Sequence, residues 1–100
     1  MAAQTKQQLF HESSKYLVGG VTASTRLNKA LQEPFFLSHG DGAKVYDVEG
    51  REYVDLCTSH GASFLGHNNA RIKEAISQAL DMGILCSGET EYQTALAKQI

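Results

Sequence analysis

The spacing of apolar residues predicts a short amphipathic helix near the start of the chain, over residues 5–17. Its apolar residues fall on one helical face: Leu9, Phe10, Tyr16 and Leu17. Thr5 and Gln8 have the spacing of a capping box, which satisfies the first free backbone N–H groups of a helix. The glycine pair and small hydroxylated residues of 18–25 then favour an irregular loop that ends at Arg26.

Short β-prone runs separated by tight-turn residues follow this loop. The runs cover 35–37, 45–48 and 53–57. Gly42 and Gly50 lie in the intervening turns, where glycine readily adopts the positive φ that such turns require. The pattern predicts a small antiparallel meander, and the glycines of 59–69 predict a second loop after it.

Helical spacing returns between residues 69 and 82. The apolar residues there share one face: Ile72, Ala75, Ile76, Ala79 and Leu80. Asn68 or Asn69 can cap the start of this helix, and Gly83 can end it. The sequence therefore predicts a second amphipathic helix.

A third helix is predicted from Thr90 onward, because Thr90 and Gln93 form another pair at capping-box spacing. Tyr92, Leu96 and Ile100 then make an apolar stripe. No terminating signal follows that stripe, so we expect the sequence to stop inside a helix, as it would in a truncated chain.

Together these elements predict an α+β fold with a helix over 1–17, loops and a β-meander over 18–67, and helices over 68–100. We expect Val54 and Leu56 of the sheet to face the helix of 69–82. Because three strands and three helices are too few to cover all of their own apolar faces, we also expect exposed apolar surface.

Composition places the chain among ordinary globular proteins: 42% of residues are hydrophobic, 20% are charged and the mean hydropathy is −0.27. The net charge is −2 and the charges are scattered, which argues against nucleic acid or a polybasic membrane surface as partner. No apolar leader or stretch of roughly 18 apolar residues is present, so we expect a cytoplasmic protein with no membrane partner.

Candidate metal, phosphate and nucleophile sites lack the required spacing. Cys57, His60, His67 and Cys86 meet none of the usual zinc spacings, so no metal site is predicted. The Gly19–Gly20 pair lacks the Gly-Lys-Ser/Thr of a phosphate loop. Ser59 precedes His60, but adjacent side chains rarely point at one another, and no GxSxG elbow surrounds them.

Arg26 is the remaining candidate. The planar fork of an arginine matches the two oxygens of a carboxylate, so Arg26 could hold a substrate carboxylate at the end of the glycine-containing loop. The alternative is a solvated surface arginine, which is the commoner role of this residue type.

Read in order, the sequence contains a composite pattern. It consists of GGV-x-x-x-x-R at 19–26, DGA-x-x-x-D-x-x-G at 41–50, Tyr53-Val-Asp55, Ser59-His-Gly61, Leu65-Gly-His67 and Thr90-Glu91. This pattern resembles the N-terminal portion of class III pyridoxal-phosphate-dependent aminotransferases, and within them the glutamate-1-semialdehyde aminomutase type. The similarity extends from about Leu9 to Ile100.

The resemblance implies a segment of a fold-type I enzyme that packs on a large cofactor domain, which this chain lacks. In the family the segment helps to wall a substrate pocket at a homodimer interface, and the substrate is a small amino acid or amine. Arg26 matches the arginine that binds the substrate carboxylate in the aminomutase type. Ser59 and His60 match positions beside the substrate and cofactor.

Departures from the family pattern bear on the substrate. His60 stands where the aminomutase type usually has a tryptophan, and Ala23 and Ser24 replace a typical serine and proline. The pocket wall thus loses an aromatic face and gains an imidazole. We therefore favour an aminotransferase that moves an amino group between an amino acid or amine and a keto acid, with the aminomutase as alternative.

In the family, the Schiff-base lysine, the aspartate on the pyridine nitrogen and the phosphate loop all come later than Ile100. Lys73 and Lys98 are available, but nothing around them matches a cofactor site. We expect no catalytic or cofactor-binding residue in this chain, and no pyridoxal phosphate bound by it alone. It would then be an inactive truncated form, or alternatively a non-catalytic module that binds a partner.

Overall fold

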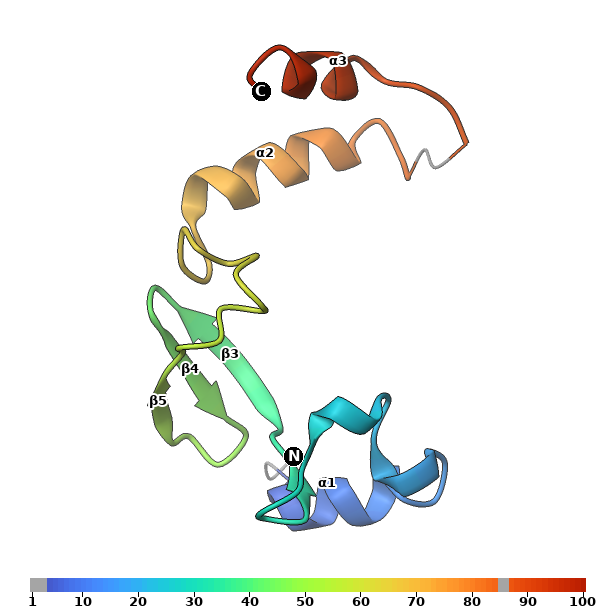
Figure 1. Ribbon diagram of the computed structural model, residues 1–100, viewed down its shortest axis with the longest axis vertical. Helices are drawn as coiled ribbons and strands as arrows, with labels where there is room; N and C mark the ends of the chain where they lie inside the picture. Colours follow the sequence, from blue (N-terminus) through green and yellow to red (C-terminus); the bar gives the residue numbers. More distant parts are fainter. Residues whose placement is uncertain (1–3, 85–86) are drawn as a thin grey trace. The chain divides into compact units, whose positions relative to one another are not determined.

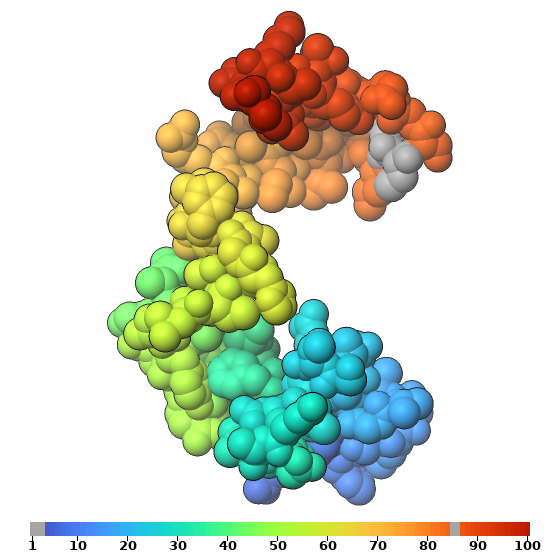
Figure 2. Space-filling model, in the orientation of Figure 1, coloured from blue at the N-terminus to red at the C-terminus, as the bar shows by residue number. Residues whose placement is uncertain are grey.

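The computed structural model describes residues 4–84 and 87–100. The chain divides into two compact units, one ending at Asn69 and the other beginning at Ala70 (Figure 1). Figure 2 shows the surfaces of both units, coloured by residue number. Each unit is described by itself below.

The first helix, α1, covers Lys6–Ser13 and begins with the predicted capping box. The Thr5 backbone N–H donates to Gln8 Oε1 at 2.9 Å, and the Gln8 N–H donates to Thr5 Oγ1 at 3.2 Å. The helix ends before the predicted Leu17, because the N–H groups of Lys15 and Tyr16 bond carbonyls only three residues back. This tightening of the chain leads into the short 3₁₀ turn η1 (Val18–Gly20).

A two-stranded antiparallel arm, absent from the sequence prediction, follows the 3₁₀ turn η2 (Ser24–Arg26). Its strands are β1 (Leu27–Asn28) and β2 (Glu33–Pro34). The Asn28 carboxamide oxygen accepts the backbone N–H groups of Ala30 and Leu31, at 3.0 and 3.1 Å. This side-chain turn reverses the chain between the two strands.

The predicted meander is confirmed as a sheet of order β3-β4-β5 with antiparallel neighbours (Figure 1). Its strands are β3 (Leu37–Asp41), β4 (Lys44–Asp47) and β5 (Glu52–Val54). Gly42 and Gly50 have φ of 53° and 81°, as the turn signals predict. The first strand lies later than expected: it begins at Leu37, which pairs with Asp47, and its register shifts between Leu37 and His39.

The second unit contains the two predicted helices, α2 (Ala70–Leu80) and α3 (Glu91–Ala97). The Thr90 N–H donates to Gln93 Oε1 at 2.9 Å, which confirms the second capping pair. The last helix ends at Ala97 rather than running to Ile100. No helix among the described residues is long and apolar enough to cross a membrane.

Apolar side chains are poorly covered in both units. Within the described parts of the chain, no hydrophobic side chain is buried. Val54 and Leu56 are 65% and 92% exposed. The expected packing of these residues on the helix of 69–82 stays a prediction, because the sheet and that helix belong to different units. The expectation of exposed apolar surface is confirmed, because these short elements supply too few side chains to form a core.

Candidate functional site

Arg26 is the last residue of η2, and its side chain is exposed. Its backbone N–H donates to the Ala23 carbonyl at 2.9 Å, which closes the turn. Among the described residues, no carboxylate forms an ion pair with its guanidinium. The turn therefore presents an arginine whose donors are not engaged by a neighbouring acid.

Ser59 and His60 lie on a left-handed turn that follows β5. Thr58, Ser59 and His60 have φ of 47°, 53° and 57°, and Gly61 follows with 89°. L-residues other than glycine are strained there by about 1–2 kcal/mol each, and a β-branched threonine is rare in this region. Ser59 and His60 are both exposed, so burial of these side chains does not stabilise the turn.

Asp55 stabilises the start of this turn. Its Oδ1 accepts the backbone N–H groups of Cys57 and Thr58, each at 2.9 Å. The Thr58 carbonyl then accepts the Ser63 N–H at 2.9 Å, which closes the turn on its far side. Backbone and side-chain hydrogen bonds thus stabilise a conformation that its residues do not favour.

The other carboxylate oxygen of Asp55 joins the two ends of the loop. Asp55 Oδ2 lies 2.7 Å from His67 Nε2, and the two side chains are 13% and 21% exposed. The Thr58 N–H and the His67 ring lower the pKa of Asp55 below its ordinary value, so the carboxylate is ionised at neutral pH. A carboxylate only accepts, so His67 Nε2 carries the hydrogen and donates it.

His67 is in turn fixed on the β3–β4 hairpin. Its backbone N–H donates to the Gly42 carbonyl at 2.8 Å, and its carbonyl accepts the Gly42 N–H at 3.1 Å. A Cβ at Gly40 would lie 2.6 Å from His67 Cγ, so the absence of a side chain at residue 40 makes room for the imidazole. The loop over 55–67 is therefore attached to the sheet at both of its ends.

A cavity of about 320 Å³ lies beneath this loop. Its lining includes Asp55, Thr58, Ser63, Phe64 and His67. Ser59 and His60 do not line it, although they directly follow Thr58. Ser59 and His60 are thus exposed residues outside the cavity lining.

A second group of polar contacts in this unit, besides that of Asp55 and His67, centres on Asp47, which is 6% exposed. Its carboxylate accepts the N–H groups of Glu49 and Arg51, at 3.0 and 2.8 Å, and also Arg51 Nε and the Tyr53 hydroxyl, each at 3.0 Å. Burial raises the pKa of Asp47, but these hydrogen bonds outweigh burial and lower the pKa below its ordinary value. Asp47 thus fixes the β4–β5 turn.

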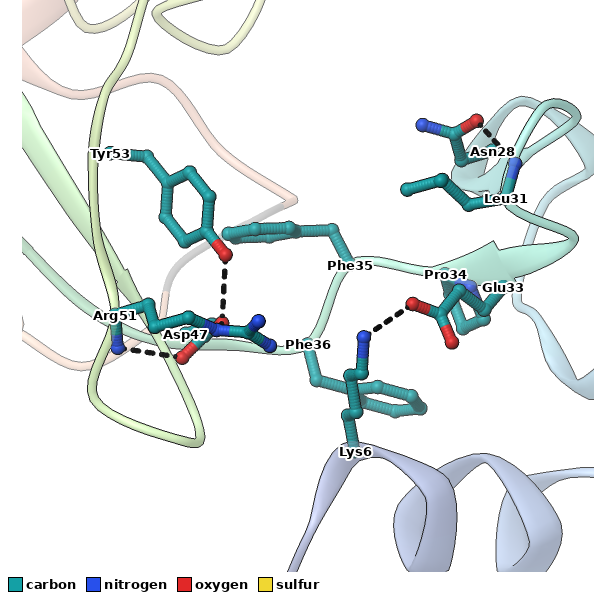
Figure 3. Close-up of a pocket in the computed structure, with 10 residues that line it drawn as sticks. All are labelled: Lys6, Asn28, Leu31, Glu33, Pro34, Phe35, Phe36, Asp47, Arg51 and Tyr53. Atoms are coloured by element: carbon teal, nitrogen blue, oxygen red, sulfur yellow. Dashed lines mark hydrogen bonds and ion pairs between the residues drawn. The ribbon is translucent and has the colours of Figure 1, made fainter.

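Asp47 and Tyr53 also line a cavity of about 340 Å³ between the arm and the sheet (Figure 3). Its apolar wall includes Phe35, whose ring meets Tyr53 edge to face with 5.0 Å between ring centroids. Its charged lining residues, shown in Figure 3, are Lys6, Glu33, Asp47 and Arg51. Because each of these charged groups has a partner within the unit, the cavity offers no unpaired charge to a ligand.

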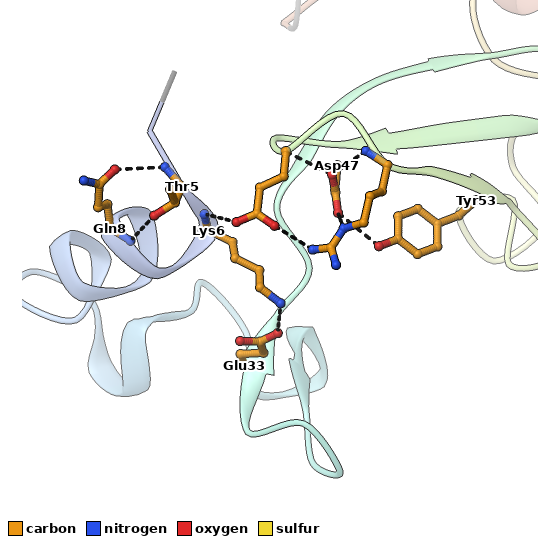
Figure 4. A network of polar contacts seen from close by, with 8 residues as sticks. Thr5, Lys6, Gln8, Glu33, Asp47 and Tyr53 are labelled. Carbon is orange, nitrogen blue, oxygen red and sulfur yellow. Dashed lines mark hydrogen bonds and ion pairs between the residues drawn. The ribbon is translucent and has the colours of Figure 1, made fainter. Parts of the chain in front are cut away.

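Lys6 connects α1 to both sheets of this unit (Figure 4). Its Nζ lies 2.6 Å from Glu33 Oε1 of the arm, and its backbone N–H donates to Glu49 Oε1 at 3.2 Å. Glu49 Oε2 pairs in turn with Arg51 Nη2 at 2.6 Å. The cluster is a structural network in which every charge has a partner.

The lysines do not fit a Schiff base to pyridoxal phosphate. Such a lysine must lose its proton and stand in a pocket with phosphate and pyridine partners. Glu33 and Glu52 raise the pKa of Lys6 and Lys44, the direction opposite to what a nucleophilic amine needs. Lys73 and Lys98 are exposed, and neither lines the cavities described above.

Metal ligands do not gather in the described part of the chain, where no group of three or more His, Cys, Asp or Glu could hold an ion. Cys57 is an exposed free thiol. Cys86 lies outside the described residues.

The structure places Ser59 and His60 next to each other on one turn. No hydrogen bond or ion pair within the described residues joins either of them to Arg26.

Sequence reasoning missed the roles of Asp47, Asp55 and His67. Two sequence features could have indicated these roles. Asp47 and Asp55 each stand shortly before a turn, and the Leu65-Gly-His67 motif ends the loop that Asp55 begins.

The model of the family described as "Aminotransferase class-III" matches residues 26–99, so the chain belongs to the class III aminotransferases. The glutamate-1-semialdehyde 2,1-aminomutase of Persephonella marina is 39% identical over 101 residues, covering 100% of this chain and 24% of that protein. The enzyme of the same name from Methanococcus maripaludis is 38% identical, covering 94% and 22%. The chain thus spans less than a quarter of the length of these curated relatives.

Solved structures confirm the predicted α+β fold. An omega-transaminase from Sphaerobacter thermophilus matches with a TM-score of 0.85 and 29% identity, covering 97% of this chain and 22% of that one. A transaminase solved with PLP bound matches with a TM-score of 0.84, covering 98% and 23%; at 23% identity it supports the fold alone. The match to the family model over 26–99 confirms the family predicted from the composite pattern.

Proposed function

We propose that this chain forms the N-terminal, substrate-facing part of a class III aminotransferase, which transfers an amino group between an amino acid or amine and a keto acid. The observation that carries the proposal is the family match over 26–99, which contains Arg26, Ser59 and His60. Pyridoxal phosphate supplies the amino-group chemistry when it is bound in the complete enzyme. The residues of this chain then bind and orient the substrate.

Arg26 serves in this proposal as the anchor for a substrate carboxylate. Two features support that role: its guanidinium is exposed, and no described carboxylate competes for it. Ser59 and His60 form part of the pocket wall, where a hydroxyl and an imidazole give hydrogen bonds that select among substrates.

The proposal assigns cofactor binding and catalysis to residues outside this chain, because the lysines described here are paired with acids or lie exposed. It treats the whole of 1–100 as one N-terminal segment, inactive by itself and assembled into a cytoplasmic homodimer. The presence of only two cysteines in the sequence supports the cytoplasmic location.

An aminomutase is the second candidate, because the curated relatives at 39% and 38% identity carry that name. The two candidates share Arg26 and differ in the fate of the amino group. An aminotransferase passes it to a second substrate, whereas an aminomutase returns it to another carbon of the same molecule.

The proposal can be tested in a hybrid enzyme, in which this chain replaces the matching segment of the P. marina aminomutase. Arg26→Ala should lower kcat/KM for amino acids roughly ten- to a hundredfold, because a charge-assisted bidentate bond contributes about 1.5–3 kcal/mol. Amines without a carboxylate should be unaffected. Arg26→Lys should recover only part of the loss, because an ammonium lacks the fork.

Lys29→Ala, which removes a nearby exposed cation, is the matched control and should leave both substrate classes unchanged. Equal losses for amino acids and amines would make Arg26 structural and refute its role. Amino transfer to an added keto acid would support the aminotransferase, and isomerisation of glutamate-1-semialdehyde alone would support the aminomutase. A folded, cofactor-loaded hybrid that performs neither reaction would refute the proposal.

A further inference from the structure

We propose that Asp55 and His67 are a positioning pair, which fixes the direction in which Ser59 and His60 face the substrate. The inference rests on the proposed function, because it requires those two residues to face a substrate. It assigns a role to residues that contact no substrate themselves and act through the turn over 58–61.

The turn over 58–61 has a conformation that its own residues disfavour. Thr58, Ser59 and His60 are left-handed, with φ between 47° and 57°, and Ser59 and His60 are exposed. Residues in such a conformation persist only when surrounding contacts impose it. The contacts that impose it therefore decide where the two side chains point.

Backbone hydrogen bonds close the turn on itself, among them Ser63 N–H to the Thr58 carbonyl at 2.9 Å, and the Asp55 carboxylate joins the turn to the end of the loop. Asp55 Oδ1 accepts the N–H groups of Cys57 and Thr58 at 2.9 Å and so sets the entry to the turn. Asp55 Oδ2 holds His67 at 2.7 Å, twelve residues along the chain. A single side chain thus couples the start of the loop to its end.

The far end of the loop is anchored independently of the turn. His67 pairs through its backbone with Gly42, and its imidazole lies over Gly40 of β3. Asn68 Nδ2 also donates to the Gly40 carbonyl, at 2.5 Å. A series of contacts therefore links the β3–β4 hairpin to His67, His67 to Asp55, and Asp55 to the turn.

Loss of Asp55 should move the turn without removing a group that binds substrate. A displacement of about 1 Å in a positioned group can lower a rate roughly a hundredfold. In the hybrid enzyme, Asp55→Ala should therefore lower kcat/KM ten- to a hundredfold. Asp55→Asn should stay within about threefold of the parent, because its amide oxygen still accepts the turn N–H groups and its NH₂ group donates to His67 Nε2 when the imidazole carries its hydrogen on Nδ1.

The decisive measurement is a mutant cycle with Ser59→Ala/His60→Ala. If Asp55 acts through those residues, Asp55→Ala should cost less than twofold in the doubly substituted background. It should also shift preference across a substrate panel in the same direction as the double substitution. Equal losses in both backgrounds would overturn the inference, as would an Asp55→Asn variant as impaired as Asp55→Ala.

Glu12→Gln is the matched control, because it breaks the 2.6 Å ion pair between Glu12 of α1 and Lys15, away from the turn. It should leave kcat/KM unchanged. If Asp55→Ala fails to fold, Gly40→Ala provides the second route, since its methyl would displace the His67 ring and should shift substrate preference in the same way. Normal kinetics in a folded Gly40→Ala hybrid would overturn the inference.

Failure here is distinguishable from failure of the proposed function. Suppose that Arg26→Ala lowers kcat/KM only for substrates with a carboxylate, while the losses in kcat/KM in the Asp55 cycle are additive. This result would support the proposed function and refute the positioning pair. Loss of activity in Arg26→Ala that ignores the substrate carboxylate would refute the assigned anchor, whatever the Asp55 cycle gives.

Discussion

The Tyr53 hydroxyl donates to Asp47 Oδ2 at 3.0 Å and so joins β5 to the end of β4. Asp47 also accepts two backbone N–H groups of the turn, and Tyr53 also packs against Phe35. Asp47→Ala should therefore speed amide exchange at Glu49 and Arg51 more than Tyr53→Phe, which removes one hydrogen bond and keeps the ring. Equal acceleration by the two substitutions would refute the central role of Asp47.

Acid should weaken both aspartate clusters. The pKa values of Asp47 and Asp55 lie below the ordinary 3.8, so the folded state favours their charged forms. Their contribution to stability is present above pH 3.8 and disappears as the pH falls through the lower folded values. Carboxyl-carbon NMR titration of the chain should give midpoints below 3.8 for both residues.

His67→Ala tests the cause of the Asp55 shift, because it removes one of the two largest contributors. The Asp55 midpoint should rise in this variant, whereas the Asp47 midpoint should not move. A midpoint for Asp55 at or above its ordinary value in the parent chain would contradict the described geometry.

Gly61→Ala should destabilise the turn locally by about 1–2 kcal/mol, because Gly61 has a φ of 89° that L-residues rarely adopt. The readout is amide exchange at Ser63, whose N–H donates to the Thr58 carbonyl at 2.9 Å. Gly88→Ala is the matched control, since a Cβ there would meet nothing within 4 Å and no left-handed φ is involved. The strain argument is wrong if both substitutions have the same effect.

The isolated chain should bind a dye such as ANS and melt without a sharp cooperative transition, because no described hydrophobic side chain is buried. Dye fluorescence and scanning calorimetry are the measurements. A sharp melt with no dye binding would instead favour an independent module that binds a partner.

Mixing the isolated chain with pyridoxal phosphate should give no absorbance band of a protein-bound aldimine. The reason is that Lys6 and Lys44 are paired with glutamates and the other lysines lie exposed. Borohydride reduction followed by peptide mass spectrometry is the check. Stoichiometric labelling of one specific lysine would show that a cofactor site exists within these residues.

Local signals in the sequence predict the elements of this fold well. The capping pairs beginning at Thr5 and Thr90 mark the starts of α1 and α3, and Gly42 and Gly50 mark the hairpin turns. These features depend on residues close together in the chain. The β1–β2 arm escapes prediction because its turn is built on the side chain of Asn28, and its strands are too short to show alternation.

The candidate site is only partly predictable. Ser59 and His60 follow from the family resemblance, but the left-handed turn that carries them does not, because Thr58, Ser59 and His60 individually disfavour it. Asp55 bonds the N–H groups at the start of this turn, and its partner His67 is twelve residues away and meets it only in the folded unit. A contact of this kind leaves no periodic signal in the sequence.

The attachment of α1 through Lys6 makes the position of this helix sensitive to ionic strength. The pair with Glu33 is about 30% exposed on both sides, so dissolved ions can reach it. Raising salt from 0.01 to 1 M shortens the screening length from about 30 to 3 Å, which weakens an exposed ion pair far more than an aromatic contact such as Phe35 on Tyr53. Concentrated salt should therefore loosen the N-terminal helix while the β-meander remains intact.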